Sequence, residues 1–245
     1  MFTENSSNLH SRQKRMIGHA FLGHGEWMIT DVIHIVKLQH AYAKICTGVI
    51  VSPKHILTAS TCNMQPAHWY TVESGAPHIS AMKTHQVYDI LHKIHLSLLL
   101  IEPPISVTSP SLSRPIALAK DPLSADIHAS IIAWGPNSQV RPITGVTIFN
   151  LLTCIDRYEH HFSITPFNIC TAQLPENNRC TSEDVGSALV VGDTLLGILV
   201  QTGSVLSVDH PDVFVRINSN EYYTWIMKNI QADLHKNAQS HNHGR

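Results

Sequence analysis

The chain has 245 residues and a mass of 27.2 kDa, which is enough for one large domain or two small ones. Its formal net charge is −1 and its sequence pI is near 7.0, so it lacks the basic excess of proteins that bind nucleic acid or anionic membranes. With 43% hydrophobic residues it can bury a substantial core, yet it has no run of about 18 apolar residues that would span a membrane. The 18 histidines are scattered and make the net charge sensitive to pH.

Residues 1–15 form a polar, basic leader that lacks the apolar core of a secretory signal peptide. The leader contains Asn5 in an Asn-Ser-Ser sequon, which is a glycosylation candidate only if the chain is secreted. It ends at Arg15 in the pattern Arg-Gln-Lys-Arg, which furin-type convertases cut. Two interpretations stay open: the leader is cleaved after Arg15, or it is an unprocessed basic segment.

From Trp27 onward, short runs rich in β-branched residues alternate with turn residues. Many short strands at this spacing are typical of all-β barrels or sandwiches. A linker rich in serine and proline, at about 107–125, divides the runs into two halves of similar size. The predicted strands cover residues 29–36, 48–51, 56–58, 71–73, 96–101, 130–134, 144–152, 188–191, 194–200 and 213–217.

One helix is predicted over 220–234, because the large side chains of this segment, such as Tyr222, Ile226 and Ile230, fall on one face. Asn218 or Ser219 could cap its first turn. The remaining residues, 235–245, are polar, so we expect a disordered tail after the helix.

Four motifs occur in the order and spacing of a known family. The segment Cys46–Cys62 ends in Thr-Ala-Ser-Thr-Cys, where that family has Thr-Ala-Ala-His-Cys. Trp134-Gly135 is similar to its Gly-Trp-Gly, Gly197–Val200 to its Gly-Ile-Val-Ser, and Tyr223–Ile226 to its Tyr-x-x-Trp-Ile. The chain therefore resembles the chymotrypsin-like serine proteases over about residues 16–233.

This resemblance implies an all-β fold, with two six-stranded antiparallel β-barrels of chymotrypsin type and a C-terminal α-helix. We expect the first barrel at about 27–106, the second at 126–219 and the helix at 220–234, all within one domain over 16–233.

The resemblance assigns the catalytic histidine, aspartate and serine of the family to Thr61, His95 and Val185. Thr61 has no group that titrates near neutrality, an imidazole at His95 cannot stabilise an imidazolium, and Val185 has no nucleophilic atom. Glu183 replaces the glycine whose N–H group faces the developing oxyanion, where a carboxylate repels negative charge. The sequence therefore predicts that no catalytic residue remains.

A substitute site is the alternative. Thr61 and His95 should be neighbours, so the imidazole could activate the hydroxyl, although a hydrogen bond without catalysis is the simpler expectation. Ser187 follows Val185 by two residues and is expected to be a turn residue rather than a nucleophile.

The activation apparatus of the family is retained in part. Met16–His19 resembles its Ile-Val-Gly-Gly segment, which cleavage after Arg15 would turn into a new N-terminus. In the family the new ammonium group pairs with the aspartate that precedes the nucleophile, and Asp184 keeps that position. Asp184 could therefore take part in a cleavage-driven switch, or it could cap nearby backbone N–H groups with or without cleavage.

The 5 cysteines leave at least one without an intrachain partner. The resemblance implies disulfides between Cys46 and Cys62 and between Cys154 and Cys170, with Cys180 as a free thiol. The alternative is a cytosolic protein in which all the cysteines are thiols.

Three further positions follow from the resemblance. Two cysteines that pair with each other in the family map to Ala129 and Val191, so these two residues should lie side by side. Asn178 stands where trypsin-like members carry an acidic residue, so we expect no selection for basic side chains.

We therefore expect a catalytically inactive serine-protease homologue that acts as a protein-binding or regulatory module, extracellular or in the secretory pathway. We expect no cofactor, no nucleic-acid partner, no membrane span and a monomeric state. No metal is expected, because no compact ligand set accompanies the tail histidines His235, His241 and His243. The alternatives are a hydrolase with residual or non-standard activity on the same scaffold, and a gene product without a selected role.

Overall fold

The computed structural model of the chain describes residues 33–41, 43–75, 82–107, 113–121, 128–134, 140–159, 161–172, 174, 179–206 and 210–242, with the backbone alone at 205 and 235–242. Asn5, Arg15, Met16 and Asn178 lie outside this part of the chain, so what the sequence predicts for them stays a prediction. Within the described ranges, no helix is both long and apolar enough to cross a membrane.

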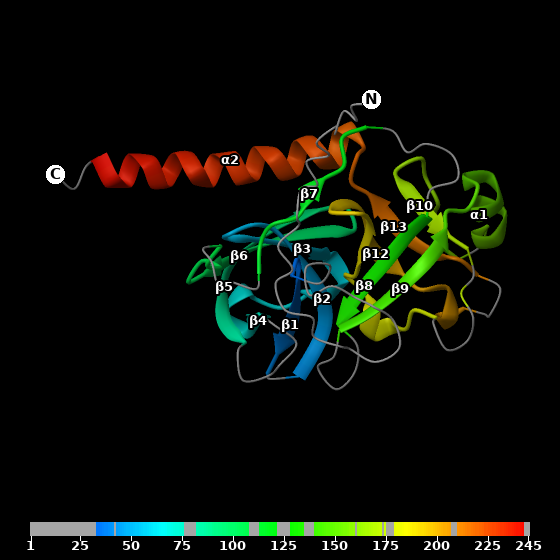
Figure 1. Cartoon of the computed structure of the whole chain (residues 1–245), viewed down its shortest axis with the longest axis horizontal. Coiled ribbons are helices and arrows are strands. Elements are labelled where there is room, and N and C mark those ends of the chain that lie inside the picture. Colours follow the sequence, from blue (N-terminus) through cyan, green and yellow to red (C-terminus); the bar gives the residue numbers. More distant parts are fainter. Residues whose placement is uncertain are drawn as a thin grey trace, which may run out of the picture.

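Six antiparallel strands form a closed barrel, the first barrel, in the order β1-β2-β3-β6-β5-β4 (Figure 1). Val49, Leu57 and Leu98 are among its core side chains, and each has 0% exposure. Because the barrel is closed, each strand is hydrogen-bonded to two neighbours and no sheet edge is left open. The strands are β1 (Ile35–His40), β2 (Ala43–Ser52), β3 (His55–Ala59), β4 (Tyr70–Ser74), β5 (Lys83–Lys93) and β6 (Leu96–Glu102).

The second half of the chain forms a 7-stranded sheet along the path β10-β13-β12-β11-β8-β9, with β7 added in parallel to β12. The two ends of this path meet at an isolated bridge between Ile148 and Thr171 rather than in a regular ladder. The expected chymotrypsin-type fold is confirmed, with a second half that is less regularly closed than the first. The strands are β7 (Ala117–Leu118), β8 (His128–Trp134), β9 (Val140–Thr147), β10 (Asn168–Thr171), β11 (Ala188–Val191), β12 (Thr194–Gln201) and β13 (Asp212–Arg216).

Helix α1 (Leu151–Tyr158) was not predicted from the sequence, which suggested a strand over 144–152. The strand β9 ends at Thr147, and the side chain of Asn150 then accepts a hydrogen bond from the backbone N–H of Leu152 at 2.8 Å. Asn150 is thus an N-cap, and the helix buries Cys154 and Tyr158, which lie one turn apart.

Helix α2 (Asn220–Asn242) begins where the sequence predicts. Ser219 caps it, because its hydroxyl accepts a hydrogen bond from the N–H of Tyr222 at 3.4 Å. The expectation of a disordered tail from 235 onward was wrong, because the helix continues to Asn242 and projects away from the barrels (Figure 1). Its last part contains alanine, leucine, lysine and glutamine and no proline or glycine, which explains why the helix continues.

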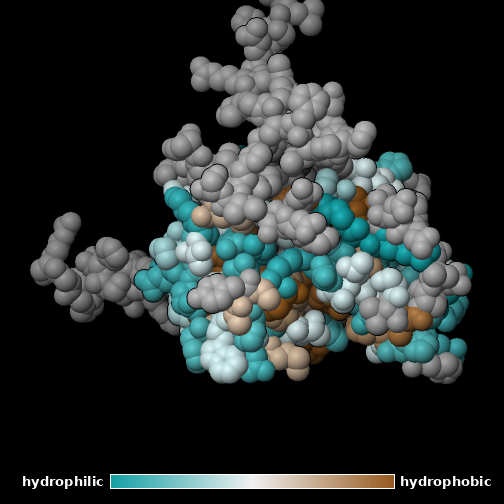
Figure 2. All heavy atoms as spheres, turned by 90° about the horizontal axis from the view of Figure 1, so that it is seen from below, coloured by the Kyte–Doolittle hydropathy of each residue, from teal (hydrophilic) through white to brown (hydrophobic). Residues whose placement is uncertain are grey.

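Several large hydrophobic side chains are exposed. Figure 2 shows one face of the molecule, where hydrophobic residues lie near the middle and hydrophilic residues surround them. Exposed hydrophobic surface that is rimmed by polar residues is common at protein–protein contacts. The exposed fractions are highest at Met64 (83%), Leu152 (70%), Ile94 (66%), Leu234 (63%), Trp69 (50%) and Val107 (50%).

Candidate functional site

The three positions that the resemblance assigns to the catalytic triad lie on loops of both halves. Thr61 lies in the short 3-10 segment η2 (Ser60–Cys62), and His95 lies in the turn between β5 and β6. The N–H of Ser60 donates to the carbonyl of His95 at 2.9 Å, which holds these two loops together. Val185 follows η7 (Ser182–Asp184) in the second half.

Thr47 on β2 connects the loop of Val185 to the first barrel. Its N–H donates to the carbonyl of Val185 at 3.0 Å, and its carbonyl accepts a hydrogen bond from the hydroxyl of Thr58 at 2.8 Å. The Thr47 hydroxyl in turn accepts from the N–H of Trp134 on β8 at 2.9 Å. The backbone frame of the site is therefore built from both halves.

Gly186 is required by this close approach. It has a φ of 87°, and a Cβ atom at this position would lie 2.0 Å from the Thr47 carbonyl oxygen and 2.5 Å from the Thr58 hydroxyl. No side chain can occupy that space, so glycine at this position keeps the loop against the first barrel.

The side chains near this backbone frame do not form a nucleophile–base–carboxylate triad. Thr61 and His95 are exposed, and no hydrogen bond joins their side chains in the described structure; the His95 ring instead lies 5.5 Å from that of Phe162. The hydroxyl of Ser187 is buried and donates to the carbonyl of Asp184, as expected for a turn residue. None of these hydroxyl groups is therefore positioned beside a base.

The backbone carbonyl of Glu183 accepts a hydrogen bond from a cationic side chain. The ammonium group of Lys44 donates to the Glu183 carbonyl at 2.6 Å, and partial burial lowers the pKa of Lys44. The Glu183 residue itself is exposed. Its carboxylate adds negative charge to the position that the resemblance assigns to the oxyanion site.

Asp184 is buried, with 2% exposure, and its oxygen Oδ2 is bonded to groups of this chain. One carboxylate oxygen accepts from the N–H of Thr181 at 2.8 Å and from the Thr181 hydroxyl at 3.1 Å, which forms a capping box on η7. The same oxygen accepts from the guanidinium of Arg141 at 2.7 Å. The capping role that the sequence left open is therefore present in the structure, and Arg141 is a partner that the sequence did not suggest.

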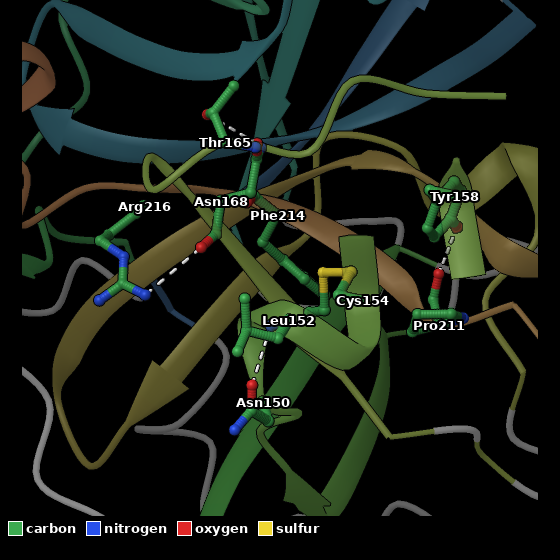
Figure 3. The surroundings of a disulfide bond; sticks show 10 residues. Asn150, Leu152, Cys154, Tyr158, Thr165, Asn168, Pro211, Phe214 and Arg216 are labelled. Carbon is green, nitrogen blue, oxygen red and sulfur yellow. Dashed lines mark hydrogen bonds between the residues drawn. A yellow bond between two sulfur atoms is a disulfide. The ribbon is translucent and has the colours of Figure 1, made fainter. Parts of the chain in front are cut away.

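Both disulfides inferred from the resemblance are present. Cys46 and Cys62 are bonded with their Cα atoms 5.9 Å apart, and Cys154 and Cys170 with theirs 6.3 Å apart. Figure 3 shows the second bond, which joins α1 to β10. Cys180 is a buried free thiol, and its pKa is raised by burial and by the nearby Asp212 carboxyl.

Ala129 and Val191 lie on the neighbouring strands β8 and β11. The ladder pairs Val190 with Ser130, so its register leads directly to these two residues. Both belong to the same hydrophobic cluster. This placement agrees with the sequence-based expectation that they replace the two ends of a lost disulfide.

The chain packs tightly around Cys180, which follows the predicted specificity position Asn178 by two residues in the sequence. Asp212 accepts a hydrogen bond from the N–H of Gly203 at 2.9 Å, and burial raises the pKa of Asp212. The Ser204 hydroxyl donates to the Cys180 carbonyl at 2.6 Å. A Cβ atom at Gly203 would lie only 1.8 Å from the carbonyl oxygen of His210, so the two backbone segments touch.

A cavity of about 220 Å³ opens beside Thr61. The exposed Trp69 stacks on His40, one of the residues that line the cavity, with ring centroids 5.7 Å apart. The sequence did not suggest this cavity, because its walls come from separate segments. The cavity is lined by His40, Ile45, Cys46, Thr61, Cys62, Met64 and Tyr70.

Comparison with known proteins agrees with the fold and the motifs. The family model described as Trypsin matches residues 23–226. The chain is 23% identical to the Anopheles gambiae protein "Serine protease SP24D" over 231 residues, which cover 89% of this chain and 82% of that protein. It is 24% identical to "Venom peptide isomerase heavy chain" from Agelenopsis aperta over 245 residues, which cover 86% of this chain and 97% of that protein.

Among solved structures, the fold is similar to that of the scabies mite inactivated protease paralogue S-D1, with a TM-score of 0.71 and 18% identity over 83% of this chain and 94% of that one. The paralogue S-I1 gives a TM-score of 0.71 and 19% identity over 83% of this chain and 97% of that one. These similarities support the fold. Because the family model covers most of the chain, the protein belongs to the trypsin family of serine-protease domains.

Proposed function

We propose that this protein is a catalytically inactive serine-protease homologue that acts as a protein-binding or regulatory module. The observation that supports this most directly is the set of side chains at the positions that the resemblance assigns to the triad. Thr61, His95 and Val185 stand there without a nucleophile and base in contact. A serine protease needs both, together with a carboxylate that orients the base.

The loss extends beyond the triad. A protease that lacks its triad keeps a rate of about 10³–10⁴ over water only through its oxyanion hole and substrate binding. Here the resemblance assigns Glu183 to an oxyanion position, where its carboxylate disfavours a developing negative charge. Transition-state stabilisation is therefore compromised.

Two further observations support a non-catalytic role. The similar scabies mite proteins are described as inactivated protease paralogues, so this fold persists in other chains after catalysis is lost. The two disulfides favour the secretory pathway or the extracellular space, where such bonds persist.

We propose that the partner is another protein, contacted by the loops around the cavity beside Thr61. Met64 and Trp69, with exposed fractions of 83% and 50%, offer the kind of side chain that contributes most to protein interfaces. Without the catalytic groups, these loops no longer have to keep the geometry of a catalytic site and are free to serve binding.

The test of inactivity is incubation of the full chain with a fluorophosphonate probe and with a broad set of peptide and ester substrates. We expect no labelled residue and a hydrolysis rate equal to that of buffer, with an active trypsin as the control for probe and substrates. Stoichiometric labelling of any hydroxyl would instead establish the alternative, a hydrolase of non-standard chemistry.

The test of binding is affinity purification with the native protein, in parallel with Trp69→Ser and with the control Tyr88→Ser. Tyr88 has a similar exposed fraction, 47%, and neither Trp69 nor Tyr88 lines the cavity, but Trp69 stacks on His40, which does. We expect a partner that is retained by the wild type and the control and lost with Trp69→Ser. A partner that all three proteins retain would place the binding surface elsewhere.

A further inference from the structure

The carboxylate of Asp184 has a resident cation in this chain. Its side chain is 3% exposed, and the Arg141 guanidinium lies 2.7 Å from it. The two residues are 43 positions apart, so the contact is a product of the fold rather than of local sequence. We propose that Arg141 replaces the ammonium group of a cleaved N-terminus, so that the loop at 181–187 has its final conformation without cleavage after Arg15.

Arg141 connects three parts of the second half. It lies on β9 and donates to the carbonyl of Arg179 at 3.0 Å as well as to Asp184. Asp184 in turn binds both the N–H and the hydroxyl of Thr181. One guanidinium therefore holds together β9, the segment that leads to Cys180, and η7.

The position of the neighbouring loop depends on this contact. Val185 follows Asp184 directly and is bonded through its carbonyl to Thr47, and Gly186 is pressed against Thr47 and Thr58. A change in the position of Asp184 would move all of these contacts. The conformation seen here is formed around an ion pair that is internal to the second half.

A second cation would add little stability by binding to the Asp184 carboxylate. A buried carboxylate without a partner is strongly destabilising, but Arg141 already supplies that partner. An ammonium group from Met16 would have to displace the guanidinium, whose side chain is 29% exposed, or lie beside it against like charge. Cleavage after Arg15 therefore leaves this loop unchanged.

The consequence concerns regulation. Under the proposed function, the surface that includes Glu183 and Val185 is presented before any processing, so cleavage does not switch binding on. The claim about Arg141 does not depend on that function, because it concerns the loop conformation alone. Labelling by a fluorophosphonate would overturn the proposed function and leave this inference intact.

The first experiment needs no substitution. Hydrogen exchange at the backbone amides of 181–187 and the thermal midpoint are measured for the full chain and for the same chain cleaved after Arg15. We expect the same protection and midpoints within about 2 °C, since a change of 1 kcal/mol shifts the midpoint of a protein of this size by about that much or more. Stronger protection and a higher midpoint after cleavage, both lost with Asp184→Asn, would show that the new N-terminus is the partner and overturn the proposal.

The second experiment tests the pair itself with Arg141→Met, Asp184→Asn and the double variant, all in the full chain. The control is Lys93→Met, which breaks the surface pair of Lys93 with Glu221, 2.7 Å apart and with side chains 29% and 37% exposed. We expect Arg141→Met to lower the midpoint by about 5–15 °C, and Asp184→Asn to cost much less in the Arg141→Met background than in the wild type. A midpoint for Arg141→Met equal to that of the control, or additive effects in the double variant, would refute the role of Arg141.

Discussion

In the first barrel all six strands lie between two hydrogen-bonded neighbours, whereas in the second half the sheet ends at β9 and β10, which meet at a bridge between Ile148 and Thr171. The second half relies instead on contacts outside its ladders. These are the disulfide Cys154–Cys170 and the links Arg141–Asp184, Gly203–Asp212 and Ser204–Cys180. The comparison indicates that the first barrel is stabilised by its closure, and the second half by a small number of specific contacts.

The positions that the resemblance assigns to catalysis are also divided between the two halves. Thr61 and His95 lie on loops of the first barrel, joined through the hydrogen bond from Ser60 to His95. Val185 and Glu183 lie on the loop that the Arg141–Asp184 pair holds in place. We therefore expect the first-barrel part of the former site to keep its frame, and the second-half part to be reshaped.

The largest difference between the two halves should appear in the free energy of unfolding that is lost when each disulfide is removed. Each closes a loop with a sequence separation of 16, for which loop entropy predicts a loss of about 3 kcal/mol. Replacing Cys154 and Cys170 by alanine should cost more than replacing Cys46 and Cys62, because the former bond fixes α1 to β10 where the sheet is not closed by a regular ladder. Urea unfolding at pH 7 gives both free energies of unfolding.

Cys180→Ala is the matched control, since it removes a buried thiol that forms no disulfide. An equal or larger loss for the first-barrel pair would show that closure of the barrel gives no additional stability, and the comparison between the two halves would fail.

The second difference is a dependence of stability on pH that originates in the first barrel. Burial lowers the pKa of His34, His55 and His85, so folding disfavours their protonated form. Their unfolded pKa is about 6.5, so the unfolded state binds more protons as the pH falls below that value. The free energy of unfolding should therefore be highest above pH about 6.5 and should decrease below it.

His85→Gln should reduce this decrease, because His85 is 2% exposed and bonded to Ser74 at 2.7 Å and to the Pro103 carbonyl at 2.6 Å. The exposed His128 of β8 provides the control, His128→Gln, which should leave the pH dependence as in the wild type. The measurement is urea unfolding at a series of pH values between 5 and 8. A pH dependence that is as steep in His85→Gln as in His128→Gln would contradict the assignment to the first barrel.

Substitutions where α2 contacts the first barrel should cause smaller losses of stability. The Tyr222 hydroxyl donates to the Ile94 carbonyl at 2.9 Å, and Tyr222 is 4% exposed, so Tyr222→Phe should cost about 1 kcal/mol. The nearby surface pair of Lys93 and Glu221 should contribute less, about 0.2–1 kcal/mol, and its contribution should fall with salt. Thermal unfolding at low and high salt separates the two. A larger loss for Lys93→Ala than for Tyr222→Phe would be the opposite of this prediction.

The sequence predicted the fold because its strands and motifs are local. Runs such as 188–191 and 194–200 consist of β-branched and other apolar residues, and they correspond closely to β11 and β12. Strand β5 was not predicted because it alternates polar residues, and His85 and Val87 are the two residues that it buries fully. The start of helix α1 was assigned to a strand because Ile148 and Phe149 extend the β-favouring run of β9 up to the cap, Asn150.

The candidate site was predicted only where motifs mark it. Thr61, His95 and Val185 were assigned because flanking residues match family motifs, and the structure joins the loops of Thr61 and His95 and bonds Val185 to Thr47 of the first barrel. Arg141 carries no such signal, since its contact with Asp184 depends on how β9 packs against η7. The cavity beside Thr61 was missed for the same reason, because His40, Thr61 and Met64 meet only in the folded chain.

The last prediction concerns reversion of the triad, and its expected effect on activity is zero. Thr61→His together with His95→Asp should create an imidazole–carboxylate pair, because the frame of the first barrel is intact and an aspartate tolerates the φ of 66° at position 95. The pair should raise the pKa of the introduced imidazole, which NMR titration can measure. Adding Val185→Ser should still give no peptidase activity, because Glu183 and the packing around Cys180 and Asp212 remain. A normal imidazole pKa would show that the first-barrel frame is also lost, whereas measurable hydrolysis would show that the second half kept its catalytic geometry and that the three side chains alone account for inactivity.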